Sequence, residues 1–267
     1  MVPDAGGLLE YLHRHYPDGE YTAVYESGFS GFSTYYSLAG CGIRCIIAHA
    51  ADIPTTQYEE TMKTDRIDAE KLARCLKVGL LNGIYVRPRE SIDDRSVVRI
   101  RKTIQDQLCS NRVRLIHLLH SNGVELPSRF VNHGTLWSRA FISWLRDDVV
   151  LLSQTRTSLD LLLMQVESMR QNLLVAAREL RKLSLTERYS GNFRLLRSIP
   201  GIGPVVSMCI LTELGDIGRF RNEREFASYL GLIPTCHSSG EKVAHGEKTF
   251  RGNKKVGPML VPYRFDD

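Results

Sequence analysis

The 267-residue sequence lacks long apolar runs. No stretch of about 18 residues is apolar throughout, so no membrane-spanning helix is predicted. The first residues lack a basic run followed by an apolar stretch, so no export signal is predicted and a cytoplasmic location is expected. The six cysteines are scattered and are expected to be reduced thiols. Cys41 and Cys45 are spaced like half of a zinc site, but no second Cys or His pair follows, so zinc is not predicted.

Positive charge is unevenly distributed. The formal net charge is +5, and residues 87–114 carry eight Arg or Lys against four acids, while residues 241–264 carry six against two. Two basic segments are typical of a polyanionic partner such as nucleic acid, although a solvated helix face and a basic tail would have the same composition. The candidate nucleic-acid-binding cations are Arg99, Arg101, Lys102, Lys242, Arg251 and Lys254.

The N-terminal part has the pattern of an α/β sheet. Residues 21–25 and 43–48 are rich in β-branched and aromatic residues and predict two strands, with a helix over 30–39 between them. A strand, helix, strand order predicts a parallel sheet, whose ligands gather beyond the carboxyl ends of the strands. Glu26 lies at such an end, and its alternative is an exposed residue in a turn.

Two aspartates begin the next predicted helix, over 64–78. Asp65 and Asp68 are three residues apart, which places both carboxylates on one helix face, close enough to hold a hard cation such as Mg²⁺. The structural alternative is that Thr64 or Asp65 caps the helix while Asp68 favours its dipole. Together with Glu26, the two aspartates would form an acidic set suited to metal-assisted phosphoryl transfer.

A long helical segment follows. Residues 91–122 predict a basic amphipathic helix, and residues 152–183 carry an apolar heptad repeat that predicts a coiled coil. Its partner is either the 91–122 helix folded back or the same helix of another subunit. The repeat positions are Leu152, Leu159, Val166, Leu173 and Leu180, with Leu162, Met169, Ala176 and Leu183 three residues further on.

The C-terminal part contains two motifs. Ile199-Pro200-Gly201-Ile202-Gly203-Pro204 predicts a hairpin between two helices, in which Gly201 and Gly203 would let backbone N–H groups approach a DNA phosphate. A tight helix connection would have similar residues. A further helix is predicted over 223–230, and a loop with short elements from Gly231 onward. In that loop Ser238-Ser239-Gly240 contains a candidate nucleophile, Ser239, although such a tripeptide is commonly a turn.

Four segments, taken in order, resemble the insertion-sequence-110 family of transposases and the related Piv-type DNA invertases. The resemblance covers nearly the whole chain. The segments are Tyr25-Glu26-Ser27-Gly28, then Lys63-Thr64-Asp65-Arg66-Ile67-Asp68-Ala69, then Ile199-Pro200-Gly201-Ile202-Gly203-Pro204, and finally Tyr229-Leu230-Gly231-Leu232-Ile233-Pro234 leading into Ser238-Ser239-Gly240 and Arg251-Gly252-Asn253.

The resemblance implies an RNase H-like N-terminal domain, akin to Holliday-junction resolvases, with four carboxylates that bind Mg²⁺. Glu26, Asp65 and Asp68 match its second, third and fourth members. It also implies a C-terminal serine that attacks DNA, matched best by Ser239 and otherwise by Ser238. The expected partners are DNA, a guide RNA encoded by the element, and further copies of the chain through the coiled coil, in a nucleoid-associated location.

The sequence also departs from the family pattern. The family's first aspartate precedes the glutamate by several tens of residues, whereas only 25 residues precede Glu26, and Asp4 lies in a segment without strand character. Family members continue with further helices after the Arg-Gly-Asn segment, and residues 257–267 of this sequence do not resemble those helices. The expectation is therefore a chain shortened at both ends, with an incomplete active site.

The expected organisation has three parts. They are a partial RNase H-like α/β domain over 1–88, a basic helix and coiled-coil linker over 89–190, and a mostly α C-terminal domain with a helix-hairpin-helix-like motif and a serine loop over 191–267. The expected function is metal-dependent DNA cleavage and strand transfer with a serine nucleophile. The alternatives are a non-catalytic nucleic-acid-binding remnant that pairs with intact transposase, and a nuclease like the Holliday-junction resolvases.

Overall fold

A computed structural model describes residues 4–62, 64–131, 134–232, 234–239, 242–248, 252–253 and 256. Within 234–248 it describes the backbone alone. The chain divides into two compact units, residues 1–87 and 88–267. The second unit contains both the expected helical linker and the expected C-terminal domain. The boundary between these two parts near residue 190 therefore stays a prediction.

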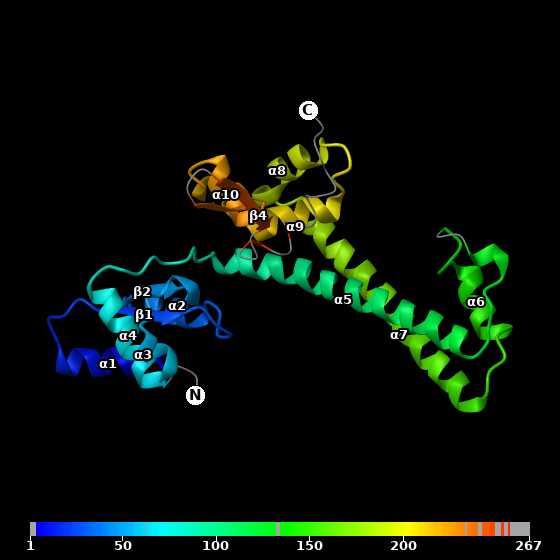
Figure 1. The fold of residues 1–267 in the computed structure, drawn as a ribbon, viewed down its shortest axis with the longest axis horizontal. Helices are drawn as coiled ribbons and strands as arrows, with labels where there is room; N and C mark the ends of the chain where they lie inside the picture. The colour runs from blue at the N-terminus through cyan, green and yellow to red at the C-terminus, as the bar shows by residue number, and fades with distance from the viewer. Residues whose placement is uncertain are drawn as a thin grey trace. The chain divides into compact units, whose positions relative to one another are not determined.

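The first unit is a small parallel sheet with helices on both faces (Figure 1). Strands β1 and β2 pair in parallel, with Val24 opposite Ile46 and Glu26 opposite Ala48. The helix between them, α2, makes the crossover that a parallel pair requires. The elements of this unit are α1 (Ala5–His15), β1 (Thr22–Glu26), α2 (Ser33–Gly40), β2 (Arg44–Ala48), the 3-10 turn η1 (Ala50–Asp52), α3 (Gln57–Thr61) and α4 (Asp65–Lys77).

Alternate residues of the strands belong to two different cores. Val24 and Ala48 pack with Cys75 and its neighbours on α4, whereas Ala23 packs with Leu38 of α2 and with α1. Side chains of a strand alternate between its faces, so Glu26, two residues after Val24, shares the face that α4 covers. The expected strand-helix-strand unit is present, and an RNase H-like topology remains a prediction.

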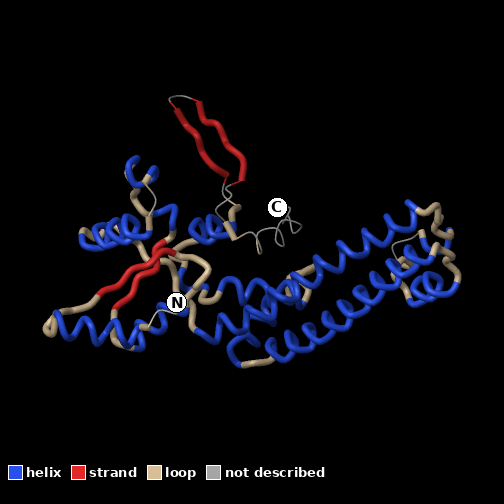
Figure 2. Tube along the Cα trace, turned by 90° about the horizontal axis from the view of Figure 1, so that it is seen from below, coloured by secondary structure: helices blue, strands red, loops and turns tan. Residues whose placement is uncertain are grey.

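The second unit is mostly helical. Figures 1 and 2 show α5 and α7 as long helices that lie side by side, joined through α6. Its elements are α5 (Arg89–Ser121), η2 (Ser128–Phe130), α6 (Arg139–Asp147), α7 (Ser153–Ser184), α8 (Glu187–Arg197), α9 (Pro204–Leu214), η3 (Ile217–Arg219), α10 (Glu223–Leu230), β3 (Pro234–Ser239) and β4 (Lys242–Lys248).

Helix α5 is the partner along which the apolar heptad positions of α7 pack. Leu159, Val166 and Leu180 of α7 are buried, and Leu159 shares a core with Leu115 of α5 and the aromatic residues of α6. Leu152, in contrast, precedes α7 and is 83% exposed. The packing agrees with the folded-back alternative, while supercoiling and pairing between subunits remain predictions.

The C-terminal elements form two further cores, and the first of them packs against α5 and α7. Val98 of α5 and Leu180 of α7 pack with Met208 of α9. Leu214 and Leu230 of the next core enclose Val256, which is fully buried. The strands β3 and β4 form an antiparallel hairpin, where only loop with short elements was expected. None of the described helices has the length and apolar character needed to cross a bilayer.

Candidate functional site

Thr64 caps the helix that carries the two aspartates. Its side chain accepts a hydrogen bond from Ile67 N at 3.3 Å, the usual N-cap contact. Of the two capping residues considered from the sequence, the structure therefore selects Thr64. Asp65 is exposed and Asp68 is half-buried in the first turn of α4, so neither carboxylate is occupied by capping.

A lysine one turn further along α4 lies beside Asp68. Lys71 is buried, and its Nζ lies 2.8 Å from Asp68 Oδ1. This hydrogen bond raises the pKa of Lys71, and the charges of Glu59 and Glu26 act in the same direction. Glu26 and Asp68, predicted from separate parts of the sequence, thus act on one ammonium group.

The third carboxylate near Lys71 has a structural explanation. Glu59 accepts hydrogen bonds from Thr56 N at 2.8 Å and Thr56 Oγ1 at 2.9 Å, and it pairs with Arg74. The Thr56 backbone contact, followed by the Arg74 contact, lowers the pKa of Glu59 to about 2. Thr56 and Glu59 form a capping box at the start of α3, a Thr-x-x-Glu pattern visible in the sequence but not used in the prediction.

The described acids do not by themselves form a site for a divalent cation. Their oxygen donors suit Mg²⁺ chemically. However, no three His, Cys, Asp or Glu side chains within the described ranges lie close enough together to hold an ion. The ammonium of Lys71 already neutralises Asp68. The structure thus gives Glu26 and Asp68 a shared neighbour but does not gather Glu26, Asp65 and Asp68 around one point.

The predicted glycine hairpin lies between α8 and α9. Gly201 has a φ of 86°, a conformation that favours glycine, and Gly203 is the N-cap residue of α9 with Pro204 in the first turn. Arg197 donates a hydrogen bond to Ile202 O across the connection. The geometry suits both interpretations, a tight helix connection and an approach to phosphate, so DNA contact by Gly201 and Gly203 stays a prediction.

The predicted serine lies at the end of a strand. Ser239 is the last residue of β3 and pairs in register with Lys242, the first residue of β4. The side chains of both lie outside the described part of the chain, as do Arg251 and Lys254 altogether. A nucleophilic role for Ser239 and DNA contact by these three cations remain predictions.

Two of the basic candidates on α5 already have acidic partners. Lys102 forms an exposed ion pair with Asp106. Arg99 donates from Nε to Glu213 Oε1 at 2.7 Å and from Nη2 to Glu213 Oε2 at 2.9 Å. Arg101 is partly buried, which lowers its pKa, and its Nε has no hydrogen-bond partner among the described residues. Arg99 therefore has a structural role between helices, and its contact with nucleic acid stays a prediction.

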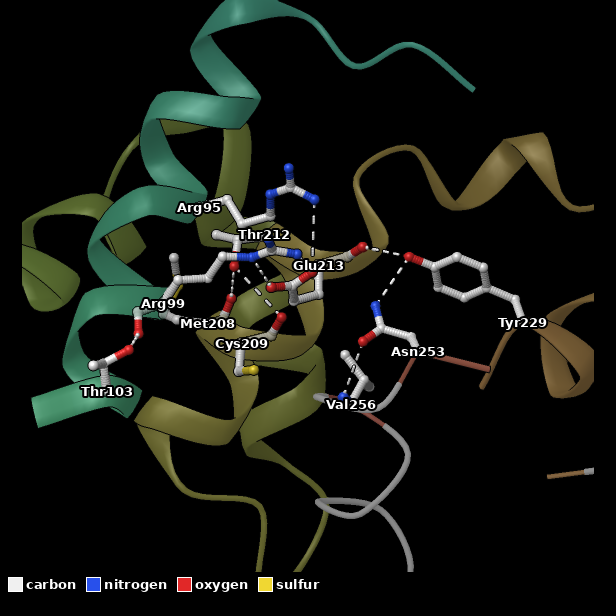
Figure 3. A network of polar contacts seen from close by, with 10 residues as sticks. All are labelled: Arg95, Arg99, Thr103, Met208, Cys209, Thr212, Glu213, Tyr229, Asn253 and Val256. Carbon is white, nitrogen blue, oxygen red and sulfur yellow. Dashed lines mark hydrogen bonds and ion pairs between the residues drawn. The ribbon is translucent and has the colours of Figure 1, made fainter. Parts of the chain in front are cut away.

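Glu213 is the centre of a polar network that the sequence did not reveal (Figure 3). Its side chain is 1% exposed, and Arg95 approaches it at 3.7 Å from the same helix as Arg99. Burial alone would raise the pKa of Glu213, but Arg99, Arg95 and Asn253 together outweigh it, so the pKa is lowered. On the other side, Tyr229 O–H donates to Glu213 O at 3.0 Å, and Asn253 Nδ2 donates to the Tyr229 hydroxyl at 3.0 Å.

The network joins two segments that resemblance had singled out, around Tyr229 and around Asn253. Both fall within residues 193–262, which match the model of the transposase IS116/IS110/IS902 family. This C-terminal region therefore resembles a transposase domain. The resemblance of the chain to insertion-sequence transposases of the IS110 family is thereby confirmed.

Curated relatives extend the similarity over most of the chain. The transposase-named protein y4qE of Sinorhizobium fredii is 27% identical over 237 residues, which are 89% of this chain and 56% of that protein. The transposase for insertion sequence element IS1111A of Coxiella burnetii is 22% identical over 76% of this chain and 54% of its own length. The transposase for element IS1328 of Yersinia enterocolitica is 25% identical over 76% and 58%. The chain thus spans somewhat more than half the length of these relatives.

Proposed function

We propose that this chain cleaves and joins DNA as part of insertion-sequence transposition. The observation that carries the proposal is the contact of Asp68, at the start of α4, with the buried ammonium group of Lys71, whose pKa the charge of Glu26 at the end of β1 also raises. The match of residues 193–262 to a transposase family supports a role of these acids in DNA cleavage. DNA is accordingly the proposed partner, with two basic segments to contact it.

Glu26, Asp65 and Asp68 would hold a divalent cation, and Mg²⁺ is proposed. When bound, such an ion polarises phosphate oxygens and promotes formation of the attacking oxygen nucleophile. The described acids are too far apart for this arrangement, so Lys71 would have to leave Asp68 and a further oxygen donor would have to join. The role of the chain's own residues is to present carboxylate oxygens from one sheet edge and one helix start.

Ser239 is the proposed nucleophile, with Ser238 as the neighbouring alternative. Its hydroxyl oxygen would form a bond to a DNA phosphorus while the bond from that phosphorus to a deoxyribose oxygen breaks. The serine proton passes to solvent, and the released deoxyribose oxygen takes up a proton, so the exchange of ester bonds needs no oxidant or reductant. Reversal with a second DNA end would join strands.

The test is formation of a covalent protein–DNA adduct. The chain is incubated with Mg²⁺ and labelled DNA that carries the ends of its own element, and adducts are counted after denaturation. Ser239→Ala is expected to abolish the adduct, whereas Ser168→Ala, an exposed serine of α7, leaves it unchanged. An adduct that persists in both Ser239→Ala and Ser238→Ala would refute the serine chemistry.

A second candidate function is nucleic-acid binding without catalysis, in which the chain pairs with intact copies. It is favoured by the absence of a gathered acidic triad in the described ranges. Retention of element DNA or of its transcript, with no adduct under any metal condition, would support this candidate. Cleavage of branched DNA alone, independent of Ser239, would instead indicate a nuclease like the Holliday-junction resolvases. Homo-oligomer formation and RNA guidance are proposals that the same binding assays address.

A further inference from the structure

The segment that carries the proposed nucleophile begins and ends at one point of the fold. Residues 232–251 leave α10 at Gly231 and return at Gly252. A Cβ atom placed on Gly252 would lie 2.3 Å from both Cα and N of Gly231 and 2.8 Å from the carbonyl carbon of Leu230. No side chain fits in that space, so the two backbones are in direct contact. Asn253 N donates to Tyr229 O at 2.7 Å, a second contact that holds the two ends of the segment together.

Side chains attach these joined segment ends to the helical core. Asn253 Nδ2 donates to the Tyr229 hydroxyl, which itself donates to Glu213 O at the end of α9 (Figure 3). Val256 N donates to Asn253 Oδ1 at 3.4 Å, and Val256 is fully buried against Leu230 and its neighbours. The Glu213 carboxylate continues the chain of contacts to Arg99 of α5.

Such an attachment matters because the hairpin is small. Strands β3 and β4 are six and seven residues long, and a two-stranded hairpin is marginally stable on its own. A nucleophile must be held close to its reacting geometry, and a misplacement of about 1 Å can cost roughly 100-fold in rate. The position of Ser239 therefore depends on what fixes the ends of the hairpin.

We propose that Gly252, Asn253 and Tyr229 are positioning residues that fix the ends of the β3–β4 hairpin, and with them the position of Ser239, to α10 and the end of α9. The proposal rests on the proposed function of Ser239 as the residue that attacks a DNA phosphate. It gives Asn253 a role inside the domain: it orders the strand ends and does not bind DNA.

The first measurement is hydrogen–deuterium exchange of the backbone amides in β3 and β4. Tyr229→Phe removes the hydroxyl that links Asn253 to Glu213 O, and Asn253→Ala removes the side-chain contacts with Tyr229 and Val256. Exchange in the hairpin should therefore become about five-fold faster while α5 and α7 keep their protection. Gly252→Ala should have the largest effect, because its methyl group would separate the two backbones. The matched controls are Asn192→Ala, exposed on α8, and Gly191→Ala, where an added Cβ meets nothing within 4 Å.

The second measurement separates positioning from general stability. In Asn253→Ala and Tyr229→Phe the affinity for element DNA should stay within about two-fold of the wild type, while the rate of adduct formation falls by at least about ten-fold. Unchanged hairpin exchange in both variants, or equal loss of affinity and rate, would overturn the proposal. If the wild type forms no adduct although hairpin exchange responds as expected, the serine chemistry fails and the anchoring stands.

Discussion

Among single residues, Lys71 has the most direct influence on the acidic site. Its ammonium group neutralises Asp68, and the negative charge of Glu26 also stabilises it. Lys71 therefore competes with any cation for the same carboxylates. Lys71→Met keeps most of the aliphatic stem but removes the charge. We expect the affinity for Mg²⁺, measured by calorimetry, to rise about ten-fold, because the cation no longer displaces an ion pair. Lys77→Met, exposed at the end of α4, is the control, and equal affinity in wild type and Lys71→Met would contradict this role.

The sequence predicted the identity of Glu26, Asp65 and Asp68 but not their neighbours. Thr64 was one of two capping candidates, and only the structure shows that it, and not Asp65, caps α4. Lys71 lies three residues after Asp68, a spacing at which helical side chains meet, so its pairing was readable from the sequence. The network around Glu213 was not, because it joins residues more than 100 positions apart in the chain.

At the scale of elements, the helix pair contains a buried asparagine. Asn111 of α5 is 3% exposed, donates to Gln165 Oε1 of α7 at 2.9 Å, and accepts from Arg114 at 2.9 Å. A buried Asn between paired helices can fix their register at a cost in stability. Asn111→Leu should therefore raise the free energy of unfolding by about 1 kcal/mol in denaturant titrations, and broaden the distribution of association states in light scattering. Asn172→Leu, exposed on α7, should do neither; a destabilised Asn111→Leu would count against the register role.

Long periodic elements were the easiest to predict. The helix expected over 223–230 is α10, and those expected over 64–78 and 91–122 differ from α4 and α5 by one or two residues at each end. The short helix α6 was not predicted, although Ser138 caps it, because its apolar residues are held by the aromatic core with Phe130 and have little periodic length. The strands β3 and β4 were expected as loop, since their polar, glycine-containing sequence has weak strand propensity.

For the whole molecule, the question is which of its positive charges are available to a nucleic acid. The net charge of +5 is modest, and part of the basic helix is neutralised internally. Arg99 is committed to buried Glu213, whereas the exposed pair of Lys102 with Asp106 is weak and easily exchanged for a phosphate. The basic excess over residues 241–264 should therefore contribute more to nucleic-acid affinity than its length suggests.

Salt dependence distinguishes these two kinds of cation. Each phosphate contact contributes about 0.9 to the slope of log affinity against log salt for duplex DNA. Lys242→Gln should reduce this slope by about 1 while the melting temperature stays unchanged. Arg99→Gln should leave the slope unchanged but lower the free energy of unfolding by about 2 kcal/mol, because the buried Glu213 carboxylate would lose its two-bond charged partner. If instead Arg99→Gln reduces the slope at constant stability, Arg99 contacts DNA directly and its pair with Glu213 must open when DNA binds.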